Sequence, residues 1–134
     1  MAYKVFISHG SDDTWVAQQI EKQILHLGAT TFLDASVIEG GDKFEDEIFG
    51  EIPNSDELFV LLTPWSIERA YIQMEIGAGI SDKKRIVFVL YGITKEEMLN
   101  TSKMPAAKTR QMFVMNELDK YFKELANRIF LNNK

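Results

Sequence analysis

Hydrophobic and polar positions along the chain repeat with two different periods. Short runs rich in Val, Ile, Leu and Phe predict strands, and segments with apolar residues at every third or fourth position predict amphipathic helices. The expected strands are residues 4–8, 29–33, 58–62, 85–90 and 111–115. The expected helices are residues 12–27, 43–52, 66–81, 94–99 and 116–131.

The same periodicity predicts which helical positions are buried. Ser11 or Asp12 is expected to cap the first helix, and Gly28 is expected to end it. Gly77 and Gly79 fall inside a helical pattern, so we interpret them as positions of close helix-to-sheet packing. The expected buried rows are Val16, Ile20, Ile24 and Leu27, then Ile72, Ile76 and Ile80, and finally Leu118, Phe122, Leu125 and Ile129.

Strands and helices alternate along the whole chain, which predicts an α/β fold of three layers. A central parallel sheet of about five strands, in the order 2-1-3-4-5, would carry helices on both faces. The length of 134 residues predicts a single domain over residues 1–134, and 46% apolar residues suffice for its core.

Composition narrows the possible functions. The chain has no cysteine, which excludes disulfides, thiolate metal sites and a cysteine nucleophile. Because we find neither a long apolar run nor a cleavable signal segment, we expect a cytoplasmic protein without membrane contact. A net charge of −5 argues against binding to nucleic acid.

Charge is distributed unevenly along the chain. Residues 39–57 hold eight acidic side chains and one lysine, whereas residues 100–134 hold seven basic and three acidic side chains. Ordinary solvated surface explains this pattern, and head-to-tail self-association through complementary patches is the alternative.

The expected sheet brings the loops that follow its first and third strands to one crevice, where folds of this type bind ligands. Helices beginning after Gly10 and Pro64 would offer backbone amides to an anion there. No GxGxxG or GxxxxGK[ST] pattern is present, which disfavours dinucleotide binding of the Rossmann type and P-loop hydrolysis. His9 has no second histidine beside it, so we expect no metal site. The loops deliver Ser8, His9, Gly10, Thr63, Pro64 and Trp65, with Asp34 nearby from the second strand.

Tyr71 and Glu75 lie one helical turn apart in the helix expected after the third strand, so the ring of Tyr71 and the carboxylate of Glu75 share one face of that helix. Glu68 follows the same stripe, but it falls at the entry to the helix, and we therefore favour Glu75 as the functional acid. A mid-helix glutamate facing solvent is the structural alternative. Trp65 is either a stacking surface for a ligand ring or part of the core or a lid.

Three segments together resemble the Toll/interleukin-1 receptor (TIR) domain family. KVFISHGSDD is similar to the first box of the family, and GATTFLDASVIEGGD is similar to its second strand and BB loop. NSDELFVLLTPWSIERAYIQMEIGAG is similar to the third strand, the CC loop and the helix with the catalytic glutamate. The likeness covers nearly the whole chain.

This resemblance implies a flavodoxin-like fold and cleavage of NAD+ at the nicotinamide-ribose bond. Glu75 corresponds to the catalytic glutamate of the family, and Tyr71 to a position that is often tryptophan. NAD+ would be the substrate, and no further cofactor would be needed. The protein would assemble through TIR-TIR contacts, and the BB loop of a neighbouring subunit, which corresponds to residues 34–42, would complete each active site. The residues expected to shape the pocket are Phe6, Ser8, His9, Gly10, Asp34, Trp65 and Tyr71.

As a nearly free-standing domain, the chain resembles bacterial defence proteins such as the TIR component of Thoeris systems, and this resemblance implies a cyclic ADP-ribose signal to a downstream effector. It departs from the family pattern at His9, Thr63, Arg69 and Tyr71, which leaves the substrate pose open. A non-catalytic interaction module is the alternative function, and hydrolysis of another nucleotide glycosidic bond is a third.

Overall fold

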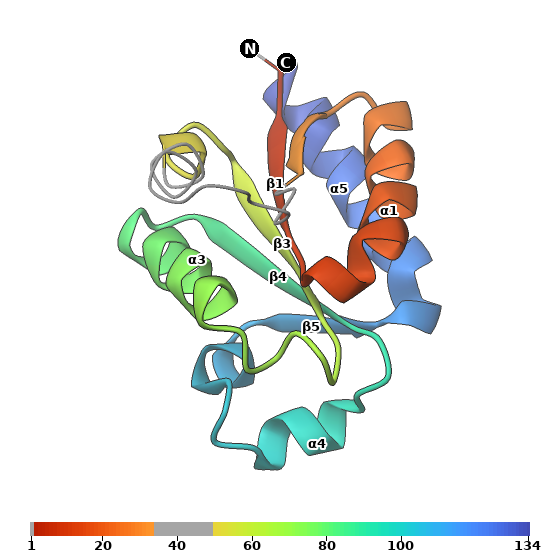
Figure 1. Cartoon of the computed structure of the whole chain (residues 1–134). Coiled ribbons are helices and arrows are strands. Elements are labelled where there is room, and N and C mark those ends of the chain that lie inside the picture. Colours follow the sequence, from red (N-terminus) through yellow and green to blue (C-terminus); the bar gives the residue numbers. More distant parts are fainter. Residues whose placement is uncertain (1, 34–49) are drawn as a thin grey trace.

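A computed structural model of the chain describes residues 2–33 and 50–134 (Figure 1). Within these residues, five parallel strands form one sheet in the order β2-β1-β3-β4-β5, which confirms the predicted topology. Because β1 lies between β2 and β3, the carboxyl ends of β1 and β3 form the point at which strand order reverses. The strands are β1 (Lys4–Ser8), β2 (Thr30–Leu33), β3 (Glu57–Leu62), β4 (Arg85–Leu90) and β5 (Gln111–Val114).

Helices cover both faces of this sheet. Most of the helix expected over residues 43–52 lies outside the described residues. Gly28 follows α1 with a φ of 102°, which confirms it as the residue that ends this helix. In the described part of the chain, no helix combines the length and apolar character that a membrane crossing requires. The α-helices are α1 (Thr14–His26), α3 (Ala70–Ser81), α4 (Lys95–Asn100) and α5 (Leu118–Asn132), and short 3-10 helices span Ser11–Asp13, Pro105–Thr109 and Met115–Glu117.

Side chains of the strands alternate between two hydrophobic cores. In β1, Val5 and Ile7 pack in the core formed with α1 and α5, whereas Phe6 packs in the core formed with α3 and α4. Figure 1 shows α1 and α5 together on one side of the sheet and α3 on the other. Because successive strand residues point to opposite faces, Ser8 and His9 are expected to project to opposite sides.

Helix α3 begins at Ala70, so the expected start at Ser66 was wrong. The Ser66 hydroxyl accepts a hydrogen bond from the Thr63 backbone N–H at 2.9 Å, and the Ser66 N–H donates to the Thr63 carbonyl at 3.1 Å. Arg69 then has extended backbone, with φ −70° and ψ 125°. Ser66 therefore stabilises a tight turn before the helix, and α3 starts about one turn later than expected.

The buried face of α3 also differs from the expected row. Ile80 is exposed, and Gly79 is buried against the sheet in its place. A Cβ atom on Gly79 would lie only 2.7 Å from Leu58 Cδ2, which confirms close packing at this glycine. Gly77 is exposed and a Cβ there would meet nothing within 4 Å, so the same interpretation was wrong for Gly77.

Glu57, the last residue of the acidic run 39–57, is fully buried, so the interpretation of this run as solvated surface is wrong at this position. It accepts hydrogen bonds from the Tyr3 hydroxyl at 2.5 Å, the Tyr121 hydroxyl at 2.6 Å and Arg128 Nε at 2.8 Å. Burial, and then the nearby Glu57 charge, raise the pKa of Tyr121. α5 accordingly buries Tyr121 more completely than Phe122. One residue of the acidic run and one of the basic run therefore pair inside the fold, at the amino end of β3.

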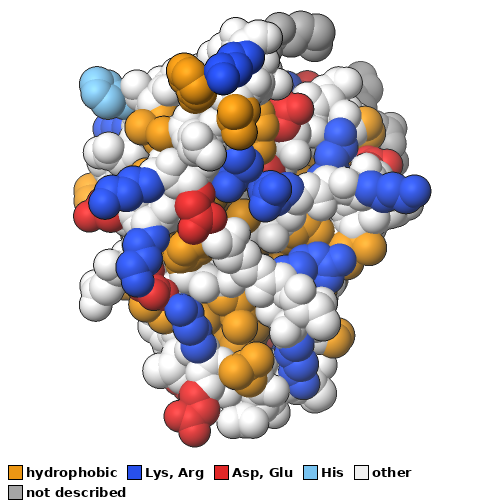
Figure 2. Space-filling model, turned by 180° about the vertical axis from the view of Figure 1, so that it is seen from behind, with side chains coloured by type: hydrophobic (Ala, Val, Ile, Leu, Met, Phe, Trp, Pro, Cys, Tyr) orange, Lys and Arg blue, Asp and Glu red, His pale blue; other side chains and the backbone are white. Residues whose placement is uncertain are grey.

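The face seen from behind carries Lys and Arg side chains spread among hydrophobic and a few acidic ones (Figure 2). Some basic side chains form exposed ion pairs, such as Lys103 with Glu68 at 3.1 Å and Lys95 with Glu117 at 2.7 Å. The hydrogen bond from Lys95, supported by the Val114 N–H, lowers the pKa of Glu117 to about 2. Such exposed pairs contribute little to stability because solvent screens them.

Candidate active site

The carboxylate of Glu75 lies inside the fold at the carboxyl end of β1. Glu75 is only 1% exposed and lies on the buried face of α3, between Ile72 and Ile76. The Ser8 hydroxyl donates a hydrogen bond to Glu75 Oε1 at 2.6 Å. The alternative of a solvent-facing mid-helix glutamate is therefore wrong, and the acid favoured from the sequence lies at the predicted edge of the sheet.

Tyr71 makes a second link between α3 and the end of β1. It is half-buried, and its hydroxyl donates to the backbone carbonyl of His9 at 3.0 Å. Since Tyr71 and Glu75 are one turn apart, the helix contacts consecutive residues of the chain, Ser8 and His9, through these two hydrogen bonds. The first turns of α3 are thus fixed to β1 where the site forms.

Phe6 lies on the same side of the sheet as Ser8. It is fully buried, and its ring stacks on the ring of Phe32 from β2, with centroids 5.2 Å apart and planes inclined by 21°. Phe32 was not among the candidate residues, although its position opposite Phe6 in the parallel register follows from the predicted strand pairing. The two rings give an apolar wall to this side of the β1–β2 pair.

His9 points to the other side of the sheet, as strand alternation requires. Its Nε2 lies 3.3 Å from Thr14 Oγ1 at the start of α1, and the residue is fully buried. Burial lowers the pKa of His9, and the nearby Asp13 carboxylate partly opposes this shift. The structure therefore separates the imidazole of His9 from Glu75, whereas the backbone carbonyl of His9 remains in the site.

A buried polar cluster joins the loops that follow β1 and β3. Thr63 Oγ1 donates to Asp13 Oδ2 at 2.7 Å and lies 3.3 Å from Ser66 Oγ. A Cβ atom on Gly10 would lie 3.0 Å from Ser66 Cβ, so the two loops are in close contact. The buried Asp13 carboxylate belongs to this cluster.

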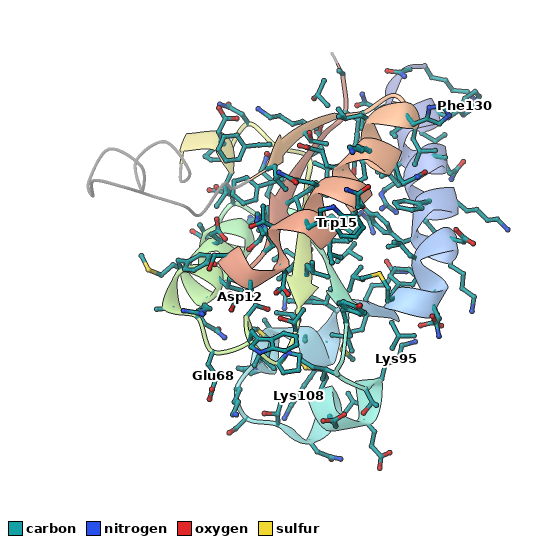
Figure 3. The ribbon with its side chains drawn as sticks, turned by 45° about the vertical axis from the view of Figure 1, so that its right-hand side comes forward. Asp12, Trp15, Glu68, Lys95, Lys108 and Phe130 are labelled. Atoms are coloured by element: carbon teal, nitrogen blue, oxygen red, sulfur yellow. The ribbon has the colours of Figure 1, made fainter. Side chains whose placement is uncertain are left out.

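The remaining candidate residues are exposed or lie outside the described residues. Trp65 is 61% exposed, so it is not part of the core. Glu68 lies on the outside of the loop before α3, where it pairs with Lys103 (Figure 3). Asp34 falls outside the described residues. Glu68, which follows the same helical stripe in the sequence, is therefore excluded from the buried site.

Sequence reasoning missed the cluster of Asp13, Thr14 and Ser66. A serine three residues after Thr63, at the end of a buried strand, is the local signal for a side-chain turn of this kind. The partner Asp13 was not identifiable in the same way, because it lies 50 residues away along the chain.

Known proteins resemble the chain in both sequence and fold. Over 99 residues it is 26% identical to a "Probable 2' cyclic ADP-D-ribose synthase BdTIR" from Brachypodium distachyon, a match that covers 72% of this chain and 44% of that protein. The match therefore spans less than half of the length of that relative.

Two solved structures share the fold. The TIR domain of the Toll-related receptor TRR-2 from Hydra magnipapillata has a TM-score of 0.60 and 21% identity, with 98% of each chain covered. The TIR domains of the activated Roq1 resistosome, which directly recognizes the pathogen effector XopQ, have a TM-score of 0.61 and 17% identity, with 96% of this chain and 83% of theirs covered.

The family assignment rests on the sequence as a whole. The sequence model of the TIR domain family matches residues 5–128, from β1 to α5. Except for Lys4, the match includes all the segments that carried the resemblance, and the parallel sheet has the order expected of a flavodoxin-like α/β fold. The chain therefore belongs to the TIR domain family.

Proposed function

We propose that this protein cleaves NAD+ at the bond between nicotinamide and ribose, with Glu75 as the catalytic carboxylate. The observation that carries the proposal is the position of Glu75, buried at the carboxyl end of β1 and hydrogen-bonded to Ser8 at 2.6 Å. The name of the Brachypodium relative, a cyclic ADP-D-ribose synthase, supports the same substrate class.

A single buried carboxylate is suited to this chemistry. When the C1′–N bond breaks, its electron pair leaves with the pyridine nitrogen, and neutral nicotinamide departs without needing a proton. The ribose becomes an oxocarbenium-like cation, which a carboxylate at hydrogen-bond distance stabilises or traps. The burial of Glu75 strengthens this attraction, because charges interact more strongly where water is excluded.

The product depends on which nucleophile reaches C1′. Attack by water gives ADP-ribose and releases one proton, whereas attack by another group of the same molecule gives a cyclic ADP-ribose, also with loss of a proton. A dry site that holds the second nucleophile close favours cyclisation. We propose the cyclic product, in line with the name of the Brachypodium relative.

The proposal extends to how the protein acts. NAD+ is its substrate and needs no added cofactor, and activity depends on self-association of TIR domains in the cytoplasm. The resistosome structure, which contains TIR domains, supports assembly as a property of related proteins. A cyclic product would act as a signal to a separate effector, as in bacterial antiphage defence.

The test is product analysis at high protein concentration. The protein is incubated with NAD+, NADP+ and nucleoside monophosphates, with and without a crowding agent that promotes assembly. The products are separated by chromatography and identified by mass spectrometry. Wild-type protein is expected to release nicotinamide from NAD+, and Glu75→Gln is expected to release none while its circular dichroism spectrum is unchanged.

Glu68→Gln is the matched control, since Glu68 precedes the same helix but is exposed. It is expected to retain full turnover. Unchanged turnover in folded Glu75→Gln protein would refute the assignment of the acid. If assembled wild-type protein does not turn over NAD+, the alternative function of a non-catalytic interaction module is favoured. If it releases a base from the nucleoside monophosphates alone, it hydrolyses another nucleotide glycosidic bond.

A further inference from the structure

We infer that the hydroxyl groups of Ser8 and Tyr71 are positioning groups that hold Glu75 in its reactive orientation, rather than groups that bind substrate. This inference rests on the proposed function, because it assigns roles within the same site. It differs from what family resemblance implies for these two residues, which is a direct contribution to the substrate cleft.

The two hydrogen bonds fix the helix at two points one turn apart. Tyr71 is the second residue of α3, and its bond to the His9 carbonyl at 3.0 Å fixes the first turn of the helix to the end of β1. Ser8 binds the Glu75 side chain itself at 2.6 Å. Because α3 starts only at Ala70, no earlier turn of the same helix is available to anchor this end.

A glutamate needs such support. Its side chain has several rotatable bonds, and a reactive group is effective only when neighbouring contacts lock its orientation. The Ser8 hydroxyl is fully buried and gives its proton to Oε1, so this oxygen is oriented by the protein before substrate arrives. A short hydrogen bond from a hydroxyl to a carboxylate is also of the stronger, charge-assisted kind.

Each hydroxyl is already donating its proton within the protein. That of Ser8 is donated to Glu75, and that of Tyr71 to the His9 carbonyl. Donation to substrate would require breaking these bonds. A positioning role and a binding role therefore predict different kinetics: loss of positioning lowers kcat, whereas loss of substrate contact raises KM.

The first experiment measures steady-state NAD+ cleavage by Ser8→Ala. Loss of a hydrogen bond to a charged group predicts a fall in kcat of about tenfold to a hundredfold, with KM changed less than about twofold. Ser8→Thr keeps the donor and should restore most activity, and Ser81→Ala, at the exposed end of α3, is the control.

The second experiment uses Tyr71→Phe, which keeps the aromatic ring and removes only the hydroxyl. We expect kcat to fall about threefold to tenfold, as for a neutral hydrogen bond, with KM unchanged. Tyr91→Phe, at an exposed tyrosine after β4, is the matched control and should behave as wild type. A rise in KM at constant kcat in either Ser8→Ala or Tyr71→Phe would overturn the inference.

A measurement without substrate separates this inference from the proposed function. Urea midpoints are compared for Ser8→Ala, Glu75→Gln and the double variant. If Ser8 acts on Glu75, the double variant shifts the midpoint by less than the sum of the single shifts. Additive shifts would overturn the positioning role of Ser8, even if the protein cleaves NAD+. Non-additive shifts in a protein that does not cleave NAD+ would show that Ser8 orients Glu75 but would refute the proposed enzymatic function.

Discussion

Replacing Arg128 with methionine tests whether the buried carboxylate at the amino end of β3 needs its cation. Arg128 donates to Glu57 through Nε at 2.8 Å and Nη2 at 3.2 Å, and its side chain is only 15% exposed. Methionine fills similar space without charge, so the substitution leaves Glu57 with its two tyrosine donors and an uncompensated charge.

The expected loss is large for a single residue. Breaking a buried ion pair by removing one partner costs about 3–5 kcal/mol, and we expect the lower end because Arg128 retains some exposure. With a urea dependence of about 2 kcal/mol per molar, the midpoint should fall by roughly 1.5 M. This is a substantial part of the roughly 5–15 kcal/mol that stabilises a typical domain.

Unfolding is best followed by far-ultraviolet circular dichroism. The two tryptophans, Trp15 and Trp65, are 70% and 61% exposed, so their fluorescence would report unfolding weakly. Lys120→Met is the control, because Lys120 makes an exposed pair with Glu117 at 3.4 Å and should contribute less than about 1 kcal/mol.

A midpoint for Arg128→Met no lower than that of Lys120→Met would refute this reasoning, because it would show that the fold does not need the cation beside Glu57.

Two further predictions concern single positions. Gly79→Val should lower the free energy of unfolding by about 1–3 kcal/mol, because a Cβ atom there meets Leu58 Cδ2 at 2.7 Å. Gly77→Ala should raise the free energy of unfolding by up to about 1 kcal/mol, because alanine favours the helix and its Cβ atom would meet nothing within 4 Å. Urea unfolding measures both changes. Burial lowers the pKa of His9, so His9 binds a proton more readily in the unfolded chain than in the folded protein. The free energy of unfolding should therefore fall as the pH drops below about 6.5, by at most about 1.4 kcal/mol per pH unit. His9→Gln should remove this pH dependence, whereas His26→Gln, at an exposed histidine, should keep it.

Hydrophobic periodicity was sufficient to predict the five strands, because it is a pattern within single segments. The strand order followed instead from the alternation of strands and helices, which is typical of open parallel sheets. Local patterns also predicted the end of α1 at Gly28, since a residue with positive φ has a local signature. They failed at the start of α3, where the hydroxyl of Ser66 bonds back to Thr63. A serine at that point is compatible with either a helix cap or a turn, and only the packed structure decides between them.

The candidate site was predictable in part for the same reason. Helical spacing brought Tyr71 and Glu75 to one face, and the buried position of Glu75 follows from its neighbours in the isoleucine row. The direction of His9 was not anticipated, although strand alternation alone places it opposite Ser8. The Asp13–Thr63 bond joins residues far apart along the chain, and no local pattern encodes such a pair.

Glu57 and Glu75, two of the buried carboxylates among the described residues, contact different donors. Glu57 is bound by a guanidinium, which neutralises its charge and suits a structural role. The Ser8 hydroxyl that donates to Glu75 is a neutral donor, which orients an oxygen without cancelling its charge. In the proposed reaction, the carboxylate that stabilises a cationic ribose must be negatively charged when substrate arrives. A serine at this position of β1 fits that proposal, because it orders the carboxylate without neutralising it, whereas an arginine there would order the carboxylate and cancel its charge.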